Sequence, residues 1–270
     1  TYYPIIRLTR RTKGLTSIRN IMEQFRIDGK IAVITGGGSG IGLGIAEVLV
    51  KAGGRVVIVG RDEVKLKEAK LRLGEQAVYR VFDVTDKEAI PAFVAEIEQN
   101  VGPIEILVNG AGVHLKKPAL DVTDNDYLRV LDVHLLSVFA LTREVMRYMV
   151  ERRSGSIILI SSMTAFMGMT QVVAYTTAKT AILGMQRAII ADYSPMGIRV
   201  NTVSPGWIDT PMFHKATDND PARKAKILSR IPTRTFGEPA DIGNAVLYLC
   251  SPAGKYVNGV NLPVDAGAVE

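Results

Sequence analysis

The sequence predicts a doubly wound α/β fold, in which helices cover both faces of one parallel seven-stranded β-sheet. Short β-branched runs alternate with longer amphipathic segments along the 270 residues, and this alternation is typical of βαβ units. Several runs are apolar on both faces, as expected for strands that lie between two helical layers. No repeat, low-complexity tract or linker interrupts the sequence between Lys30 and the C-terminus. A single domain is therefore the simplest interpretation.

Seven runs predict the strands, and six periodic segments predict the helices. β-branched residues favour strands because they pack well on a pleated surface, whereas helices repeat apolar residues at a period near 3.6. The strands are expected at 30–35 (KIAVIT), 55–60 (RVVIVG), 77–82, 104–109, 156–161, 198–203 and 259–264. The helices are expected at 41–52, 63–73, 86–100, 124–152, 172–193 and 240–250.

The composition favours a protein that functions outside the membrane. No apolar run approaches the ~18–20 residues needed to cross a bilayer. The single cysteine, Cys250, excludes an intrachain disulfide and suits a reducing compartment, so a cytoplasmic location is expected.

The formal charge of +6 is concentrated at one end of the chain. Residues 1–21 contain Lys and Arg but no acid, and they leave only +1 for the rest. This basic extension has the character of a targeting peptide, a basic arm or translated upstream sequence, and we expect it to be peripheral to the chemistry. Residues 22–270 are expected to form the domain. Its nearly balanced charge argues against nucleic-acid binding, which only the arm could provide.

A glycine-rich turn follows the first predicted strand and opens the first predicted helix. In VITGGGSGIG, Gly36, Gly40 and Gly42 have the spacing TGxxxGxG. Glycines there permit a tight turn and a close approach of the backbone to a pyrophosphate, which then meets the helix N-terminus. In this strand–turn–helix context the motif predicts a Rossmann-like dinucleotide site.

The end of the second predicted strand bears on the choice between NAD and NADP. An NAD site usually places an acid there to bind the ribose 2′-hydroxyl. Gly60 occupies that position, and Arg61 follows it. A guanidinium suits a 2′-phosphate, so NADP is favoured. Two alternatives stay open: Arg61 is a solvated residue at a helix start, or Asp62 reaches the ribose and NAD is used.

Tyr175 and Lys179 are one helical turn apart and are expected to project side by side. Removal of a hydroxyl proton accompanies hydride transfer from an alcohol carbon to nicotinamide. A free tyrosine, with a pKa of ~10, is a poor base, but an adjacent ammonium favours its phenolate. Ser162, at the end of the fifth predicted strand, can hydrogen-bond the substrate oxygen. Tyr175 is therefore the predicted general acid/base.

These features resemble the short-chain dehydrogenase/reductase family over about residues 27–267. The resemblance implies an NAD(P)-dependent enzyme that interconverts a secondary alcohol and a carbonyl, and a homotetramer built on the long helices and the C-terminal strand. It rests on TGGGSGIG (35–42), FDVT (82–85), NGAG (109–112), ISS (160–162), YTTAK (175–179) and IRVNTVSPGWIDTPM (198–212). The implied cofactor-binding residues are Thr35, Gly36, Ser39, Gly40, Ile41, Gly42, Arg61, Asp83, Val84, Asn109, Ala111, Gly112, Tyr175, Lys179, Pro205, Gly206, Ile208 and Thr210.

Two positions depart from the family pattern. The usual NNAG is NGAG here, so Gly110 has no side chain to offer. His134 stands where a family asparagine holds a water that carries the active-site proton towards solvent. A neutral imidazole can hold that water, and a charged one can carry the proton, so His134 is a candidate catalytic residue. The alternatives are that His134 only packs near the pocket, or that the chain is a dinucleotide-binding scaffold or sensor.

The substrate is predicted only as a small molecule: a sugar acid, a polyol or a 3-oxoacyl compound. Residues 207–235 resemble the family's substrate-covering segment. Basic residues near the pocket can attract a carboxylate, or they are ordinary solvated charges. The histidines lack metal-ligand spacing, so no metal site is predicted. The basic residues concerned are His114, Lys116, Lys117, Lys215, Arg223, Lys224, Lys226 and Arg230.

Overall fold

Seven strands form one β-sheet in the order β3-β2-β1-β4-β5-β6-β7. The computed structural model describes residues 21–269, so the expectations for residues 1–20 lie outside the described residues. All neighbouring strands are parallel, which confirms the predicted fold class. The strands are β1 (Ile31–Thr35), β2 (Arg55–Gly60), β3 (Ala77–Val81), β4 (Ile104–Asn109), β5 (Gly155–Ile160), β6 (Ile198–Pro205) and β7 (Asn261–Val264).

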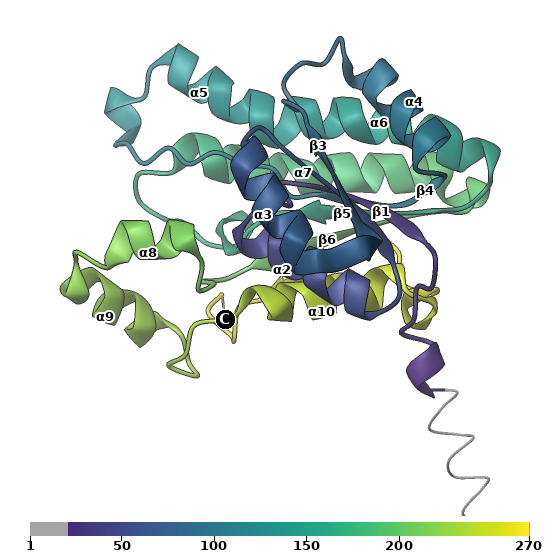
Figure 1. Cartoon of the computed structure of the whole chain (residues 1–270). Helices are drawn as coiled ribbons and strands as arrows, with labels where there is room; N and C mark the ends of the chain where they lie inside the picture. Colours follow the sequence, from purple (N-terminus) through teal and green to yellow (C-terminus); the bar gives the residue numbers. More distant parts are fainter. Residues whose placement is uncertain (1–20, 270) are drawn as a thin grey trace, which may run out of the picture.

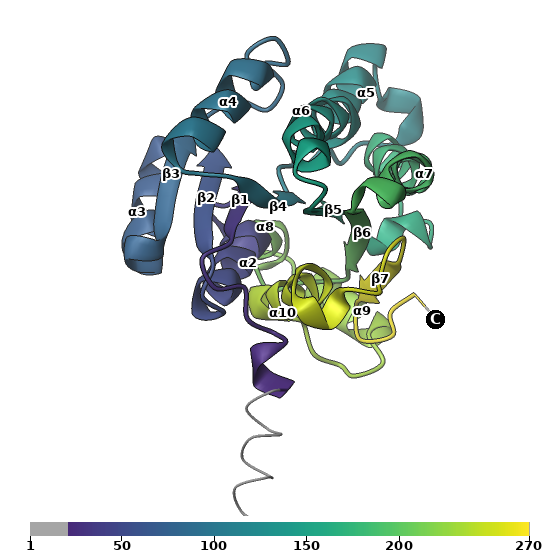
Figure 2. The same cartoon turned by 90° about the vertical axis from the view of Figure 1, so that its right-hand side faces the viewer.

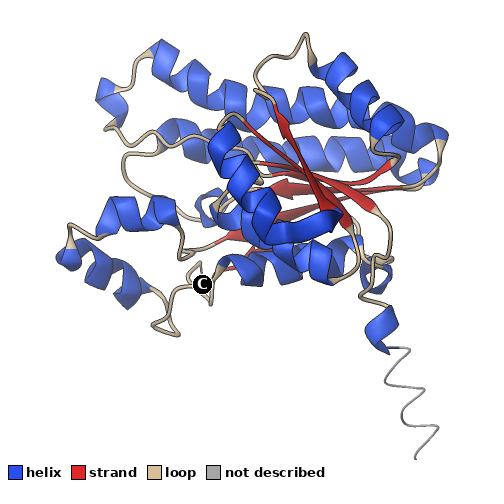
Figure 3. Ribbon diagram, viewed as in Figure 1, coloured by secondary structure: helices blue, strands red, loops and turns tan. Residues whose placement is uncertain are grey.

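Helices cover both faces of the sheet, as Figure 2 shows, and Figure 3 shows the strands enclosed between them. Helices α2, α3 and α10 pack on one face, and α4, α6 and α7 pack on the other. Their bounds are α2 (Gly40–Lys51), α3 (Glu63–Leu73), α4 (Ile90–Asn100), α6 (Ser137–Glu151), α7 (Val173–Tyr193) and α10 (Pro239–Cys250).

Two hydrophobic cores, one on each face, hold these layers together. Side chains alternate across a strand, so that Ala32 and Ile34 of β1 enter one core while Ile31 and Val33 enter the other. Burial of an aliphatic side chain of this size contributes about 1.5–3 kcal/mol. The doubly apolar strand pattern of the sequence is thus explained by helices on both sides.

The segment predicted as one helix over 124–152 is interrupted. Helix α5 (Asp124–Leu131) leads into a π turn at Asp132–Leu136, and α6 follows. Such turns within helices occur frequently at functional sites. This one contains His134.

Two short helices lie within the predicted substrate-covering segment, for which the sequence analysis named no helix. Helices α8 (Pro211–Thr217) and α9 (Pro221–Arg230) begin at the side-chain caps Thr210 and Asp220. Each cap is followed by proline, which is well suited to the first helical position. Figure 1 shows α8 and α9 beside each other, outside the two main helical layers.

The carboxyl ends of the central strands provide the place for a site. β1 lies between β2 and β4, and the chain reaches β4 only after completing β3. The order of strands therefore reverses at β1 and β4, which is where ligands bind in open α/β sheets. Among the described residues, no helix is both long and apolar enough to cross a bilayer.

Candidate active site

The glycine-rich turn borders two adjoining cavities, of about 370 Å³ and about 330 Å³. Both are lined by Gly36, Ser39, Ala111 and Gly112, so together they form one elongated cleft. The first is also lined by Gly60, Arg61, Asp83 and Val84. The second is also lined by Gly40, Ile41, Gly42, His134, Ser162, Tyr175, Lys179, Pro205, Gly206 and Thr210.

The turn itself fits a dinucleotide. Gly36 has a φ of +74°, and a Cβ there would lie 2.9 Å from the Gly110 carbonyl oxygen, so only glycine is accommodated. Ser39 precedes α2 but makes no side-chain capping bond, which leaves its hydroxyl and the first N–H groups of the helix for a phosphate. The cleft, the turn and these donors suit a nicotinamide dinucleotide.

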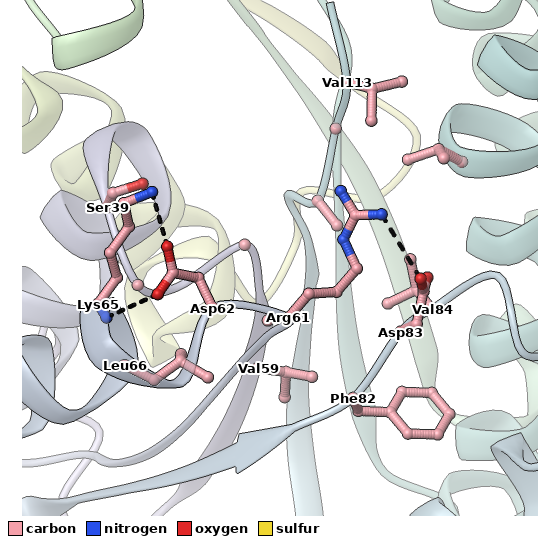
Figure 4. Close-up of a pocket in the computed structure, with 16 residues that line it drawn as sticks. Ser39, Val59, Arg61, Asp62, Lys65, Leu66, Phe82, Asp83, Val84 and Val113 are labelled. Carbon is pink, nitrogen blue, oxygen red and sulfur yellow. Dashed lines mark hydrogen bonds and ion pairs between the residues drawn. The ribbon is translucent and has the colours of Figure 1, made fainter.

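Figure 4 shows the charged side chains in the first cavity, which we call the adenosine end of the cleft. The Arg61 guanidinium lies 3.5 Å from the Asp83 carboxylate. Asp62 turns the other way, accepting a hydrogen bond from the Lys65 backbone N–H at 3.1 Å and pairing with Lys65 Nζ at 2.8 Å. These bonds lower the pKa of Asp62. Asp62 therefore caps α3, but it also lines the first cavity, so the alternative in which it reaches a ribose stays open.

Three predicted cofactor-binding residues do not line the cleft. The Thr35 hydroxyl accepts hydrogen bonds from the Gly110 and Ala111 backbones at 3.0 and 3.1 Å. Asn109 Nδ2 donates to Thr142 Oγ1 at 3.0 Å, and Ile208 is buried. None of the three lines either cavity. Thr35 and Asn109 hold the strand ends and the loop that borders the cleft.

The structure brings the predicted catalytic residues together. The Ser162 hydroxyl accepts a hydrogen bond from the Thr164 N–H at 3.1 Å and interacts with Tyr175. Lys179 Nζ lies 5.6 Å from the centre of the Tyr175 ring and donates to the Ile160 carbonyl at 2.7 Å. Side chains from α7 and from the turn that follows β5 therefore converge, and Tyr175 and Lys179 lie side by side as their i, i+4 spacing predicted.

Burial dominates the electrostatics of Tyr175 and Lys179. Burial raises the pKa of the phenol, and the hydrogen bond from Ser162 only partly opposes this. Burial also lowers the pKa of Lys179 to about 7. The sequence could not show this, because it depends on how completely both side chains are removed from water. Both groups are thus biased towards their neutral forms.

His134 is buried against the loop that follows β4. Its Nε2 lies 3.0 Å from the Val113 N–H and 2.8 Å from the Val113 carbonyl oxygen, so the peptide offers a partner to either tautomer. The ring stands edge-on to Tyr175 at 5.1 Å between centroids. Among the described residues, Nδ1 has no hydrogen-bond partner. Burial and the charge of Lys179 lower the pKa of His134 to about 3, which favours the neutral ring over the proton-carrying one.

Val113 is a site position that the sequence analysis did not identify, and Gly112, which it did identify, has a second role. A Cβ at Gly112 would lie 2.6 Å from His134 Cε1, so the last glycine of NGAG makes room for the imidazole. The sequence held one signal of this contact: Gly112 occurs together with a bulky histidine, His134, where the family has asparagine. Met212 was also missed as a residue lining the catalytic cavity.

Only some of the predicted basic residues gather at the cleft. His114 lines the catalytic cavity and also an outer groove of about 1150 Å³, which Lys116, Lys215 and Arg223 line as well. Partial burial, and then the charges of Arg223 and Lys116, lower the pKa of His114. We call Lys116 and Arg223, with the more weakly basic His114 beside them, the cationic mouth.

The other basic residues lie elsewhere. Lys117 pairs with Asp126 at 2.8 Å, and Lys224 approaches Asp218 at 4.0 Å. Lys226 and Arg230 line neither the groove nor the catalytic cavity. Among the described residues, no group of three or more His, Cys, Asp or Glu side chains is placed to hold a metal ion.

Comparison with known proteins identifies the family to which this chain belongs. A family model described as enoyl-(acyl carrier protein) reductase matches residues 36–269. The chain is 37% identical to the 2-dehydro-3-deoxy-D-gluconate 5-dehydrogenase of Pseudoalteromonas atlantica over 92% of this chain and 98% of that protein. It is 34% identical to the 3-oxoacyl-[acyl-carrier-protein] reductase of Vibrio harveyi, over 89% of this chain and 98% of that protein.

A similar solved structure is a gluconate 5-dehydrogenase from Burkholderia cenocepacia in complex with NADP and tartrate. Its TM-score is 0.87 at 33% identity, over 92% of this chain and 98% of that one. The chain therefore belongs to the short-chain dehydrogenase/reductase family. It is an NAD(P)-dependent oxidoreductase that acts on CH–OH groups, and these relatives give no support to a scaffold or sensor.

Proposed function

We propose that this chain is an NADP(H)-dependent oxidoreductase of a sugar acid, a polyhydroxy compound that carries a carboxylate. The cationic mouth carries the proposal, because Lys116 and Arg223 place positive charge in the outer groove next to His114, which also lines the cavity that contains Tyr175. A relative is named for a gluconate derivative, and tartrate, a carboxylate, is bound in a structural neighbour. A polyol has no charge, so the cationic mouth would not attract it as it would a carboxylate.

The geometry of the cleft supports the following catalytic roles. When bound, the nicotinamide cofactor supplies the acceptor or donor of the hydride. Tyr175 Oη takes the hydroxyl proton during oxidation and returns it during reduction. Ser162 Oγ holds the substrate oxygen beside Tyr175, and the ammonium of Lys179, when protonated, favours the phenolate. His134 remains a neutral neighbour, whose Nδ1 is available to hold a water on the proton path.

Substitutions at the cationic mouth test the substrate class. In Lys116→Gln and Arg223→Gln, we expect KM for a sugar acid to rise about tenfold each, or about 1.4 kcal/mol, while kcat changes little. The controls are Lys117→Gln, which alters a lysine paired with Asp126, and Lys226→Gln on the same helix as Arg223. Steady-state kinetics with sugar acids, polyols and 3-oxoacyl thioesters provide the measurement. Better turnover of uncharged polyols, or equal effects in the control variants, would contradict the proposal.

The preference for NADP rests on the adenosine end of the cleft. Arg61 lines it, while Asp62 is engaged with Lys65. A Cβ at Gly60 would only make ordinary contact with Leu66, at 3.7 Å, so Gly60→Asp introduces a carboxylate without a clash. We expect this variant to shift the ratio of kcat/KM towards NAD by tenfold or more, about 1.4 kcal/mol, with Gly60→Ala as control. A wild type that prefers NAD tenfold would overturn this assignment.

We also propose a cytoplasmic homotetramer formed by residues 22–270, with residues 1–21 peripheral. Leu128, Leu136 and Phe139 are 58%, 47% and 43% exposed along α5, the π turn and α6, and such an apolar strip favours association. Sedimentation of the chain from Met22 onward should give an oligomer. A monomer at all concentrations would exclude the assembly.

A further inference from the structure

His214 lies between two carboxylates in the segment that closes one side of the catalytic cavity. Its Nε2 is 2.6 Å from Asp209 Oδ1, and its Nδ1 is 2.9 Å from Asp218 Oδ1. Asp209 precedes α8, and Asp218 is the residue at which that helix ends. The ring therefore joins the two ends of the helix.

The two carboxylates are satisfied together only by the charged ring. An imidazolium donates from both nitrogens, whereas a neutral imidazole has one N–H and one lone pair. In the neutral state, one of the two nitrogens would present its lone pair to a carboxylate oxygen. The two acids raise the pKa of His214, with the hydrogen bond to Asp218 as the largest cause, while Lys224 of α9 opposes them. These are the charged groups that face the ring.

The joined segment contributes directly to the site. The Asp209 N–H donates to the Gly237 carbonyl at 2.7 Å, which fixes one end of the bridge to the body of the protein. Thr210, Pro211 and Met212, which follow Asp209, line the catalytic cavity. Helix α8 has only seven residues, and so short a helix depends on contacts at its ends.

We infer that His214 is a positioning residue that, as an imidazolium bridge between Asp209 and Asp218, holds residues 209–218 against the catalytic cleft, and that this segment loosens when the bridge loses its proton. Because the pKa of His214 is raised, the bridge is complete below the free histidine value of ~6.5 and is lost as the pH rises through the higher value of the folded protein. Residues 209–218 are therefore better ordered in mildly acidic than in alkaline solution.

Hydrogen exchange of the whole cofactor-free chain tests this inference without depending on the identity of the substrate. We expect protection of peptides covering residues 209–218, corrected for intrinsic exchange, to fall by about threefold or more between pH 6 and pH 8.5. His214→Gln should give low protection with no such dependence. Turnover is not the primary readout, because Lys179, with a pKa of about 7, titrates in the same range.

Two further variants test the charges that face the ring. Asp209→Asn should move the change in protection to lower pH, and Lys224→Gln should move it to higher pH. An NMR titration of the His214 ring should report a pKa above ~6.5. A His214 pKa at or below that value, or the same pH dependence of protection in His214→Gln, would overturn the inference.

Discussion

The catalytic centre and the segment at residues 207–235, which we call the cover, are built in opposite ways. Ser162, Lys179 and His134 are only 7%, 5% and 3% exposed, and each is held by hydrogen bonds to backbone groups. Helix α9, in contrast, contains no buried residue, and α8 is joined at its ends by the exposed His214 bridge. Packing thus fixes the catalytic centre, whereas charged and exposed side chains predominate in the segment beside it.

This difference explains how one scaffold can serve different substrates within a family. The buried centre tolerates little change, because each side chain is surrounded by strands and helices. Helix α9 of the cover buries none of its side chains, so its charges can change without loss of the fold. The effects of substitutions in the two regions should therefore differ in magnitude and in the property they change.

The largest effect is expected for Tyr175→Phe in the centre. Loss of the phenol removes the proton donor and acceptor, so kcat should fall by about 10³-fold or more, near the range for general acid–base catalysis. Cofactor affinity should be retained, since the ring remains. Lys179→Ala should impair both turnover and cofactor binding. Single-turnover kinetics and cofactor titration separate the two effects, and normal turnover in Tyr175→Phe would remove the mechanism.

A smaller effect is expected at His134. In His134→Ala, kcat should fall about 10–100-fold at neutral pH, and the Val113 peptide should lose a partner, which costs about 1–3 kcal/mol of stability. His134→Asn should largely preserve both, since an amide can also donate and accept. Turnover and denaturant unfolding provide the measurements. An alanine variant with wild-type turnover from pH 6 to pH 9 would exclude a role in the proton path.

The pH dependence of turnover distinguishes the two roles considered for His134, which are a neutral ring that holds a water and a charged ring that carries the proton. With a pKa of about 3, the ring stays neutral over the working range, so the wild type and His134→Asn should show the same inflections. An inflection near pH 7 is expected in both, because Lys179 has a pKa of about 7. An inflection that only the wild type shows would instead mean that the ring carries the proton.

Much of the centre could be predicted from the sequence, because its signals are local. The glycine turn follows a strand directly, and Tyr175 and Lys179 are one helical turn apart, so their proximity is dictated by helix geometry. The π turn was not predictable, since α5 and α6 keep helical periodicity on either side of it. The pKa values of Tyr175 and Lys179 depend on burial by distant elements, which no short stretch reveals.

The cover was harder to predict. Its two short helices are specified by the pairs Thr-Pro and Asp-Pro at 210–211 and 220–221, but their apolar patterns are too brief to stand out. Which basic residues face the cleft depends on how these helices lie. Thus Arg223 reaches the cationic mouth while Lys226, on the same helix, does not.

The smallest effect, and the closest comparison of the two regions, comes from two methionines. Met163 follows Ser162 and is 4% exposed, whereas Met212 of α8 is 60% exposed. Met163→Ala should lower the free energy of unfolding by about 2–5 kcal/mol, because it leaves a cavity. Met212→Ala should lower it by no more than about 0.5 kcal/mol and change KM for the substrate about two- to fivefold, since Met212 lines the catalytic cavity. Urea unfolding and steady-state kinetics measure both quantities. Equal destabilisation by the two substitutions would mean that the cover is packed as firmly as the centre. The contrast between a tightly packed catalytic centre and a loosely packed, exposed cover would then not hold.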